Sequence, residues 1–173
     1  MTVDGKQRTA LLISARLFFC DAMVLGYAGG AKATPIPDRP NGKYYEHTEG
    51  PWYLRDEYEV DPITKKSAGF TFIERNHRRL WFMAYGGFYK KEAVPCLKAA
   101  LMATYTKSDF YAGRGRDGYT QDGYLYMIAT RNSDNFGFER FFAHEAVFRA
   151  EIKEGIETPV SLGSHDVWGM ALI

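Results

Sequence analysis

The sequence predicts an α+β domain in which one antiparallel sheet carries two helices on one face. Three observations lead to this fold class. Several short segments alternate between apolar and polar residues, two longer segments space their apolar residues as a helix does, and the order of these segments occurs twice. The 173 residues are enough to bury a sizeable core. We therefore expect residues 1–173 to form a single domain with an internal duplication.

The composition excludes several classes of protein. With 22 Lys and Arg against 21 Asp and Glu, the net charge of +1 argues against a dedicated nucleic-acid binder. A hydrophobic fraction of 46%, including 16% aromatic residues, excludes a disordered chain. Cys20 and Cys96 fall among apolar residues in helical patterns, so we expect two reduced thiols in the core of a cytoplasmic protein.

The first predicted helix covers the segment around residues 11–22. Arg16 and Asp21 interrupt its apolar run, which favours an amphipathic helix over a signal peptide and excludes a membrane span, for which about 20 apolar residues are needed. Its apolar residues recur on one helical face. They are Leu11, Ala15, Phe18, Phe19 and Ala22.

Three strands are expected after this helix. The segment with Pro35, Pro37 and Pro40 is predicted to be a loop, because its Pro, Asn and Gly residues interrupt regular structure. Residues 52–60 then alternate, and Asp56 is the one polar residue on an otherwise apolar strand face. Residues 69–74 and 80–87 complete the group.

The same order follows in the second half. Glu92 and Pro95 suit the first turn of a second helix, in which Leu97, Ala100 and Leu101 keep helical spacing. Strands are then expected in four segments. They are residues 123–130, 136–142, 146–152 and the C-terminal 164–173.

Sequence similarity between the halves supports a duplication. The segment Glu57–Phe72 aligns without a gap on Leu125–Arg140, at an offset of 68 residues. We therefore predict two α-β-β-β repeats, at about 8–90 and 91–156, followed by the strand at 164–173. With its last strand moved to the front, this order is similar to the duplicated unit of GyrI-like effector-binding domains, which hold ligands between their halves.

The motifs resemble a bacterial domain of unknown function that often follows an Xre-type helix-turn-helix. The resemblance implies a sensing role but no established activity, and Met1–Lys6 is too short to supply a helix-turn-helix here. Ala84 and Thr71 depart from the pattern, where Asn and Glu are usual. The matching residues are Tyr27-Ala28-Gly29, Leu54, Asp56 and Tyr58, Trp81, Met83, Tyr85 and Gly87, and Gly137 with Glu139.

Two carboxylates are candidate site residues. Asp56 interrupts an apolar strand face, where a charge must be paired, hydrogen-bonded or directed at a ligand. Glu139 alternates with Gly137 and Phe141 and is the second candidate, although it could equally be solvated. If both acids entered one cleft, they would suit a cationic or hydroxyl-rich ligand, or acid–base catalysis.

Aromatic residues are the other candidates for the walls of this cleft. Trp81, Met83 and Tyr85 share one side of their strand and would either line a pocket or belong to the core. Tyr58 and Tyr126 extend the same argument. The basic segments at residues 75–79 and 113–118 are interpreted as solvated turns, because neither fits a phosphate-binding fingerprint.

These observations favour a small-molecule-binding or sensing domain. We expect its cleft to hold Asp56, Tyr58, Trp81, Met83, Tyr85, Tyr126 and Glu139. No metal, cofactor, membrane or nucleic-acid partner is indicated, and the adjacent Ser164-His165-Asp166 is no sign of a hydrolase without a nucleophile elbow. Two alternatives stay open: an enzyme using Asp56 and Glu139 as an acid–base pair, and a homodimeric interaction module.

Overall fold

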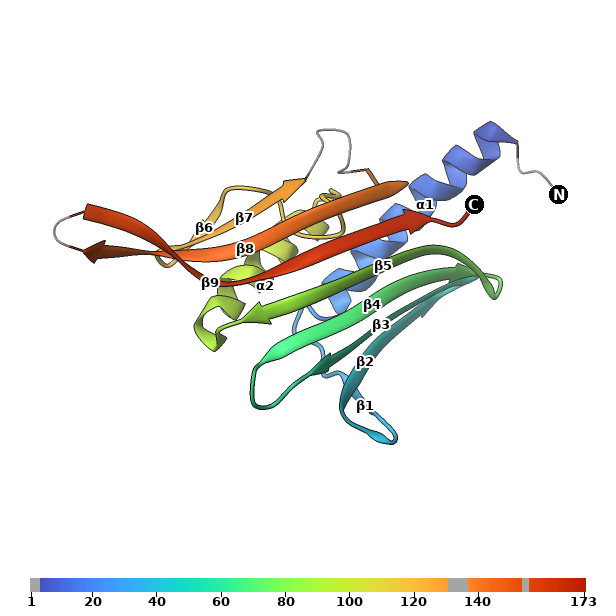
Figure 1. Ribbon diagram of the computed structural model, residues 1–173. Helices are drawn as coiled ribbons and strands as arrows, with labels where there is room; N and C mark the ends of the chain where they lie inside the picture. Colours follow the sequence, from blue (N-terminus) through green and yellow to red (C-terminus); the bar gives the residue numbers. More distant parts are fainter. Residues whose placement is uncertain (1–3, 131–136, 154–155) are drawn as a thin grey trace.

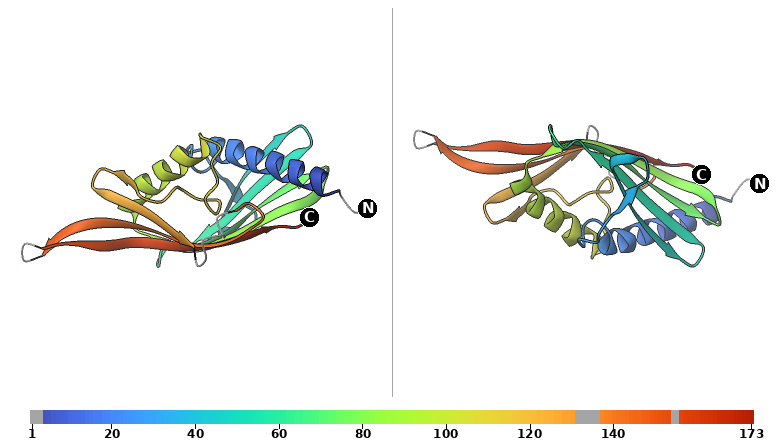
Figure 2. Two further views of the ribbon diagram at one scale, coloured as in Figure 1. Left: turned by 90° about the horizontal axis from the view of Figure 1, so that it is seen from above. Right: turned by 90° about the horizontal axis from the view of Figure 1, so that it is seen from below.

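A computed structural model describes residues 4–130, 137–153 and 156–173. Its strands form one antiparallel sheet of nine strands, and both long helices lie on the same side of it (Figures 1 and 2). The elements, in chain order, are α1 (Gly5–Leu25), β1 (Thr34–Ile36), β2 (Arg39–Glu49), β3 (Trp52–Val60), β4 (Lys66–Arg75), β5 (Arg78–Tyr89), the 3₁₀ turn η1 (Lys91–Ala93), α2 (Val94–Tyr105), β6 (Tyr119–Gln121), β7 (Tyr124–Thr130), β8 (Arg140–Lys153) and β9 (Ile156–Ala171).

The strand order places the two parts of the chain on opposite sides of a central pair. The order is β1-β2-β3-β4-β5-β9-β8-β7-β6, so β5 and the C-terminal strand β9 meet in the middle. They pair antiparallel from Trp81 with Ala171 to Tyr89 with Gly163. Gly163 has a φ of +141°, and a Cβ there would stand 2.3 Å from the carbonyl oxygen of Phe88, so this close crossing excludes a side chain.

The α+β prediction is confirmed, but three details were wrong. The segment predicted to be a Pro-containing loop instead forms β1 and the start of β2. Proline is tolerated there because β1 is an edge strand and Pro40 precedes Gly42, where β2 begins to pair with β3. Strands expected at 136–142 and 146–152 are one strand, β8, although Phe136 lies outside the described residues. The repeat predicted at about 8–90 has five strands after its helix rather than three, whereas 91–156 contains α2 and the three strands β6, β7 and β8.

The core lies between the helices and the sheet. Trp81 of β5 is its centre: the indole is fully buried, stacks on Phe138 with ring centroids 4.9 Å apart, and contacts Phe19 of α1. Its Nε1 donates a hydrogen bond of 2.8 Å to the carbonyl of Phe138. Cys20 and Cys96 are buried free thiols. Within the described ranges, no helix has the length and apolar character that a membrane span needs.

The helix-free face of the sheet carries a row of aromatic side chains. Phe70 of β4, Phe82 of β5 and Trp168 of β9 follow one another across the strands, with ring centroids 6.0 and 5.6 Å apart. Trp168 is 45% exposed. Trp81 and Trp168 therefore occupy opposite faces of the sheet, Trp81 in the core and Trp168 at the surface.

This difference predicts unequal costs of truncation. Trp81→Ala should lower the free energy of unfolding by about 3–5 kcal/mol, because it leaves a cavity and an unpaired carbonyl in the core. Trp168→Ala, the matched control, should cost about 1 kcal/mol or less. Urea unfolding followed by circular dichroism measures both. Equal losses would contradict the assignment of Trp81 to the core and Trp168 to the surface.

Candidate functional site

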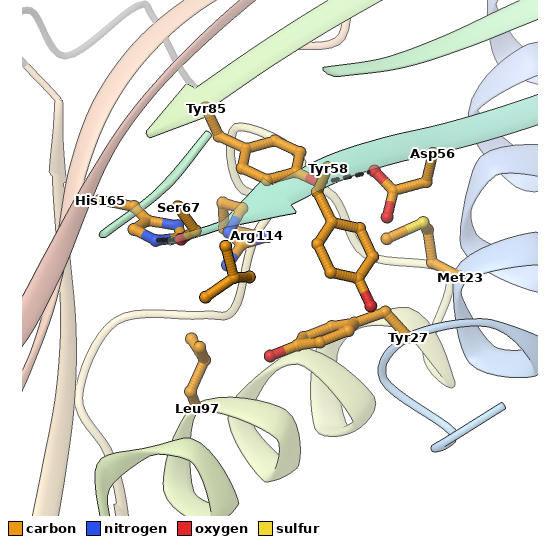
Figure 3. A pocket seen from close by; sticks show the side chains of 10 residues that line it. Met23, Tyr27, Asp56, Tyr58, Ser67, Tyr85, Leu97, Arg114 and His165 are labelled. Carbon is orange, nitrogen blue, oxygen red and sulfur yellow. Dashed lines mark hydrogen bonds between the residues drawn. The ribbon is translucent and has the colours of Figure 1, made fainter. Parts of the chain in front are cut away.

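A cavity of about 100 Å³ lies between the helix-covered face of the sheet and the two helices (Figure 3). The first part of the chain and the second part both contribute to its walls. Its volume suits a ligand the size of a small fragment rather than a nucleotide or a peptide. The lining residues are Met23, Tyr27, Asp56, Tyr58, Val60, Ser67, Tyr85, Leu97, Arg114 and His165.

Strand β3 contributes three of these residues in strict alternation. Asp56, Tyr58 and Val60 stand at every second position, so they point to the same side of the strand. This side is the one that the alternation of residues 52–60 indicated. The prediction that Asp56 and Tyr58 share a face is therefore confirmed, and that face lines the cavity.

Asp56 is buried, with 3% of its surface exposed, and its hydrogen bonds are unevenly distributed. Thr71 Oγ1 and Tyr85 Oη both donate to Oδ1, at 2.7 and 2.8 Å. Among the described residues no hydrogen bond is donated to Oδ2, which points away from Tyr85 (Figure 3). Burial raises the pKa of Asp56 above its ordinary 3.8, although the two donors and the charge of Arg114 oppose the rise.

Tyr85 reaches Asp56 because the opposite strand has a glycine. Gly69 of β4 pairs directly with Tyr85 of β5, and the phenol ring passes over it. A Cβ at Gly69 would stand 2.6 Å from the Tyr85 hydroxyl and 2.5 Å from the backbone oxygen of Glu57. The absence of a side chain at Gly69 is thus what lets Tyr85 donate to Asp56.

An ion pair closes another wall of the cavity. Arg114, in the segment between α2 and β6, donates from Nε and Nη2 to Oε1 of Glu145 on β8, at 2.9 and 2.5 Å. Oε2 of Glu145 accepts a hydrogen bond of 2.8 Å from Tyr126. Burial alone would raise the pKa of Glu145, but Arg114 outweighs it and holds that pKa below its ordinary 4.5.

His165 of β9 lies beside this pair and is 7% exposed. Its ring stacks on Tyr85, with centroids 5.9 Å apart, and its Nε2 is hydrogen-bonded to Ser67 Oγ at 3.0 Å. Its Nδ1 is buried and has no hydrogen-bond partner among the residues that the structure describes. Burial, followed by the charge of Arg114, lowers the pKa of His165 from 6.5 to about 4, so the ring is neutral at physiological pH.

Ser67, His165 and Glu145 stand in the order of a hydrolytic triad, but their geometry does not support that chemistry. Nδ1 of His165 is 3.8 Å from Oε1 of Glu145, which is beyond hydrogen-bond distance. That oxygen is already bonded to Arg114. A histidine with a pKa of about 4 is also a weak general base near neutral pH.

The predicted site residues separate into three groups. Asp56, Tyr58 and Tyr85 line the cavity. Trp81 and Met83 are fully buried core residues, and Tyr126 supports Glu145 behind the cavity wall. Glu139 has a side chain 60% exposed and pairs with Arg8, so it and Asp56 do not share a cavity. The acid–base pair of Asp56 and Glu139 therefore lacks the shared site that it requires.

Sequence reasoning missed Arg114, Glu145 and His165. The turn at residues 113–118 was interpreted as solvated, whereas Arg114 is 4% exposed. Glu145 alternates with Phe141, Ala143 and Val147, all buried, so the period-two pattern of β8 contained the only signal for it. No pattern links these three residues along the chain, because their contacts join segments far apart in sequence.

Comparisons of the chain with protein-family models, curated proteins and solved structures found no match. The resemblance of its motifs to the Xre-associated domain therefore stays a prediction. The function has to be inferred from the side chains around the cavity.

The close approach at Gly69 gives a direct test of the Tyr85–Asp56 contact. Gly69→Ala should displace the Tyr85 ring, break its hydrogen bond and cost about 1–3 kcal/mol of stability. Gly86→Ala is the matched control, since a Cβ there would meet no atom closer than 3.5 Å. Urea unfolding and the NMR shifts of the Tyr85 ring measure the two variants. Unchanged Tyr85 shifts in Gly69→Ala would contradict this account.

The lowered pKa of His165 predicts that the free energy of unfolding depends on pH. Between pH 6.5 and about 4 the unfolded chain binds a proton at this residue that the folded protein does not, so stability falls as pH falls. His165→Asn should reduce the slope of the unfolding free energy against pH by up to about 1.4 kcal/mol per pH unit, which corresponds to one proton. Urea unfolding at several pH values measures it. His77→Asn, at an exposed histidine outside the cavity, is the control.

Proposed function

We propose that this protein is a small-molecule-binding domain whose ligand occupies the cavity between the helices and the sheet. One observation carries the proposal: Asp56 is a buried carboxylate whose Oδ2 receives no hydrogen bond from the described residues, and the residue lines a cavity. Removing a charged oxygen from water without a partner costs several kcal/mol. A bound ligand would supply the missing partner.

The composition of the walls supports binding rather than structural filling. Met23, Val60 and Leu97 provide apolar surface, while Asp56 Oδ2 and His165 Nδ1 provide polar atoms with no hydrogen-bond partner among the described residues. Ligand sites usually combine a mostly apolar lining with a few polar groups that orient the ligand. The buried, shifted pKa values of Asp56 and His165 are also typical of functional sites.

The position of the cavity suits a sensor. Met23 comes from α1, Leu97 from α2, and His165 from the central strand β9. A ligand that contacts all three would join both helices to the middle of the sheet. Binding would then stabilise the packing of the helices on the sheet, which is the kind of change that a sensing domain transmits.

We also propose that the chain arose by duplication, with a helix and four strands as the repeated unit. The supporting observation is the strand order, in which β2-β3-β4-β5 on one side mirrors β6-β7-β8-β9 on the other. Under this proposal β5 and β9 are equivalent strands, and the cavity lies beside their junction. A cytoplasmic location is proposed with it, because both cysteines are free thiols.

Blocking the cavity tests the proposed function. A screen by NMR of small amines, alcohols and acids, each of about six non-hydrogen atoms, should yield compounds that shift the amide signals of lining residues. Leu97→Phe should fill the cavity and abolish these shifts. Ser67→Phe is a second blocking variant in case overpacking at Leu97 prevents folding.

Ile63→Phe is the matched control, because Ile63 is 87% exposed in the turn between β3 and β4. It adds the same aromatic ring at an exposed residue that does not line the cavity, and it should leave binding unchanged. Compounds that bind both blocking variants as well as the native protein would place the site elsewhere and overturn the proposal.

A further inference from the structure

We propose that the ligand of this cavity is a small organic cation, an ammonium group on a short apolar body, with Asp56 as its counter-ion. This inference rests on the proposed function and specifies its ligand class.

The charges of the residues around the cavity do not balance. Arg114 is positive, but two of its donors are committed to Glu145, so this pair is neutral as a unit. His165 is hydrogen-bonded to Ser67 and carries no charge when its ring is neutral. Asp56 is then the one lining residue whose charge has no partner among the described residues. The cavity therefore has an excess of one negative charge when Asp56 is ionised.

The hydrogen bonds of Asp56 leave one of its two oxygens available to a ligand. Thr71 and Tyr85 donate to Oδ1 and hold the carboxylate in one orientation. Oδ2 is left as an acceptor directed away from Tyr85 (Figure 3). A ligand ammonium could donate to this oxygen and neutralise it, forming a charge-assisted hydrogen bond that is about twice as strong as a neutral one. An anionic ligand would instead place a second negative charge beside it.

Aromatic and apolar side chains surround Asp56 in the cavity. Tyr27 and Tyr58 meet edge to face beside Asp56, with ring centroids 6.4 Å apart, and Tyr85 lies above them (Figure 3). The electron-rich faces of tyrosine rings attract cations; Lys98 and Arg114 already stand over Tyr27 and Tyr85, so we assign the contact with the ligand to Tyr58. Met23 and Leu97 add an apolar surface for the carbon body of the ligand. A cavity of about 100 Å³ limits that body to a few carbon atoms.

Three probes with the same branched five-carbon skeleton and different charge test the ligand class. They are isopentylamine, isopentanol and isopentanoate, which are positive, neutral and negative near neutral pH. Titrations followed by NMR measure the dissociation constant of each from the amide shifts of lining residues. We expect the amine to bind at least about ten-fold more tightly than the alcohol, and the carboxylate to bind most weakly.

Asp56→Asn isolates the contribution of the charge. Its side-chain oxygen can still accept from Thr71 and Tyr85, so the fold should persist, while the negative charge is lost. In this variant the amine should bind no better than the alcohol. Glu139→Gln is the matched control, because it removes an exposed carboxylate outside the cavity and should keep the full preference for the amine.

The outcomes separate this inference from the proposed function. If the alcohol or the carboxylate binds as tightly as the amine, or if Asp56→Asn keeps the preference for the amine, the cation assignment is overturned while binding in the cavity stands. If none of the three probes shifts a lining residue and the wider screen also finds no cavity binder, the proposed function fails as well.

Discussion

The buried ion pair of Arg114 and Glu145 is the interaction on which the site depends. It joins the segment between α2 and β6 to β8 in the middle of the second part of the sheet. Two charges in a low-dielectric interior must be paired and hydrogen-bonded, and here two bonds from Arg114 and one from Tyr126 meet that requirement. Burial and then the charge of Arg114, held in this way, lower the pKa of His165, while Asp56 forms no ion pair with any residue that the structure describes.

Strand β5 shows how core and site share one face of the sheet. Trp81, Met83 and Tyr85 point to the same side at successive alternate positions. Trp81 and Met83 lie under the helices and are fully buried, whereas Tyr85 reaches the cavity and donates to Asp56. The rigidity of the packed core thus extends along a single strand to the carboxylate. A site built on strands in this way holds its polar groups more precisely than one built on loops.

Periodicity was sufficient to predict which residues share a strand face, but not how deeply they are buried. The alternation of residues 52–60 correctly grouped Asp56 with Tyr58, because side chains of a strand alternate between its faces. The same reasoning grouped Trp81 and Met83 with Tyr85, and only the position of the helices separates core from cavity. The structure places Glu139 outside the cavity for a different reason. It precedes β8 and pairs with Arg8 of α1, a contact that no local sequence pattern encodes.

By itself, the sequence determined the α+β class, the two helices, most of the strands and the polar intrusion of Asp56 into an apolar face. These features follow from local spacing, since helices and strands impose periods of 3.6 and 2 on the chain. The tertiary structure alone decided that β9 pairs with β5, that Arg114 is buried against Glu145, and that His165 lies beside Ser67. Each of these contacts joins distant segments, and the cost of burying polar groups, which selects their partners, depends on packing that no single segment contains.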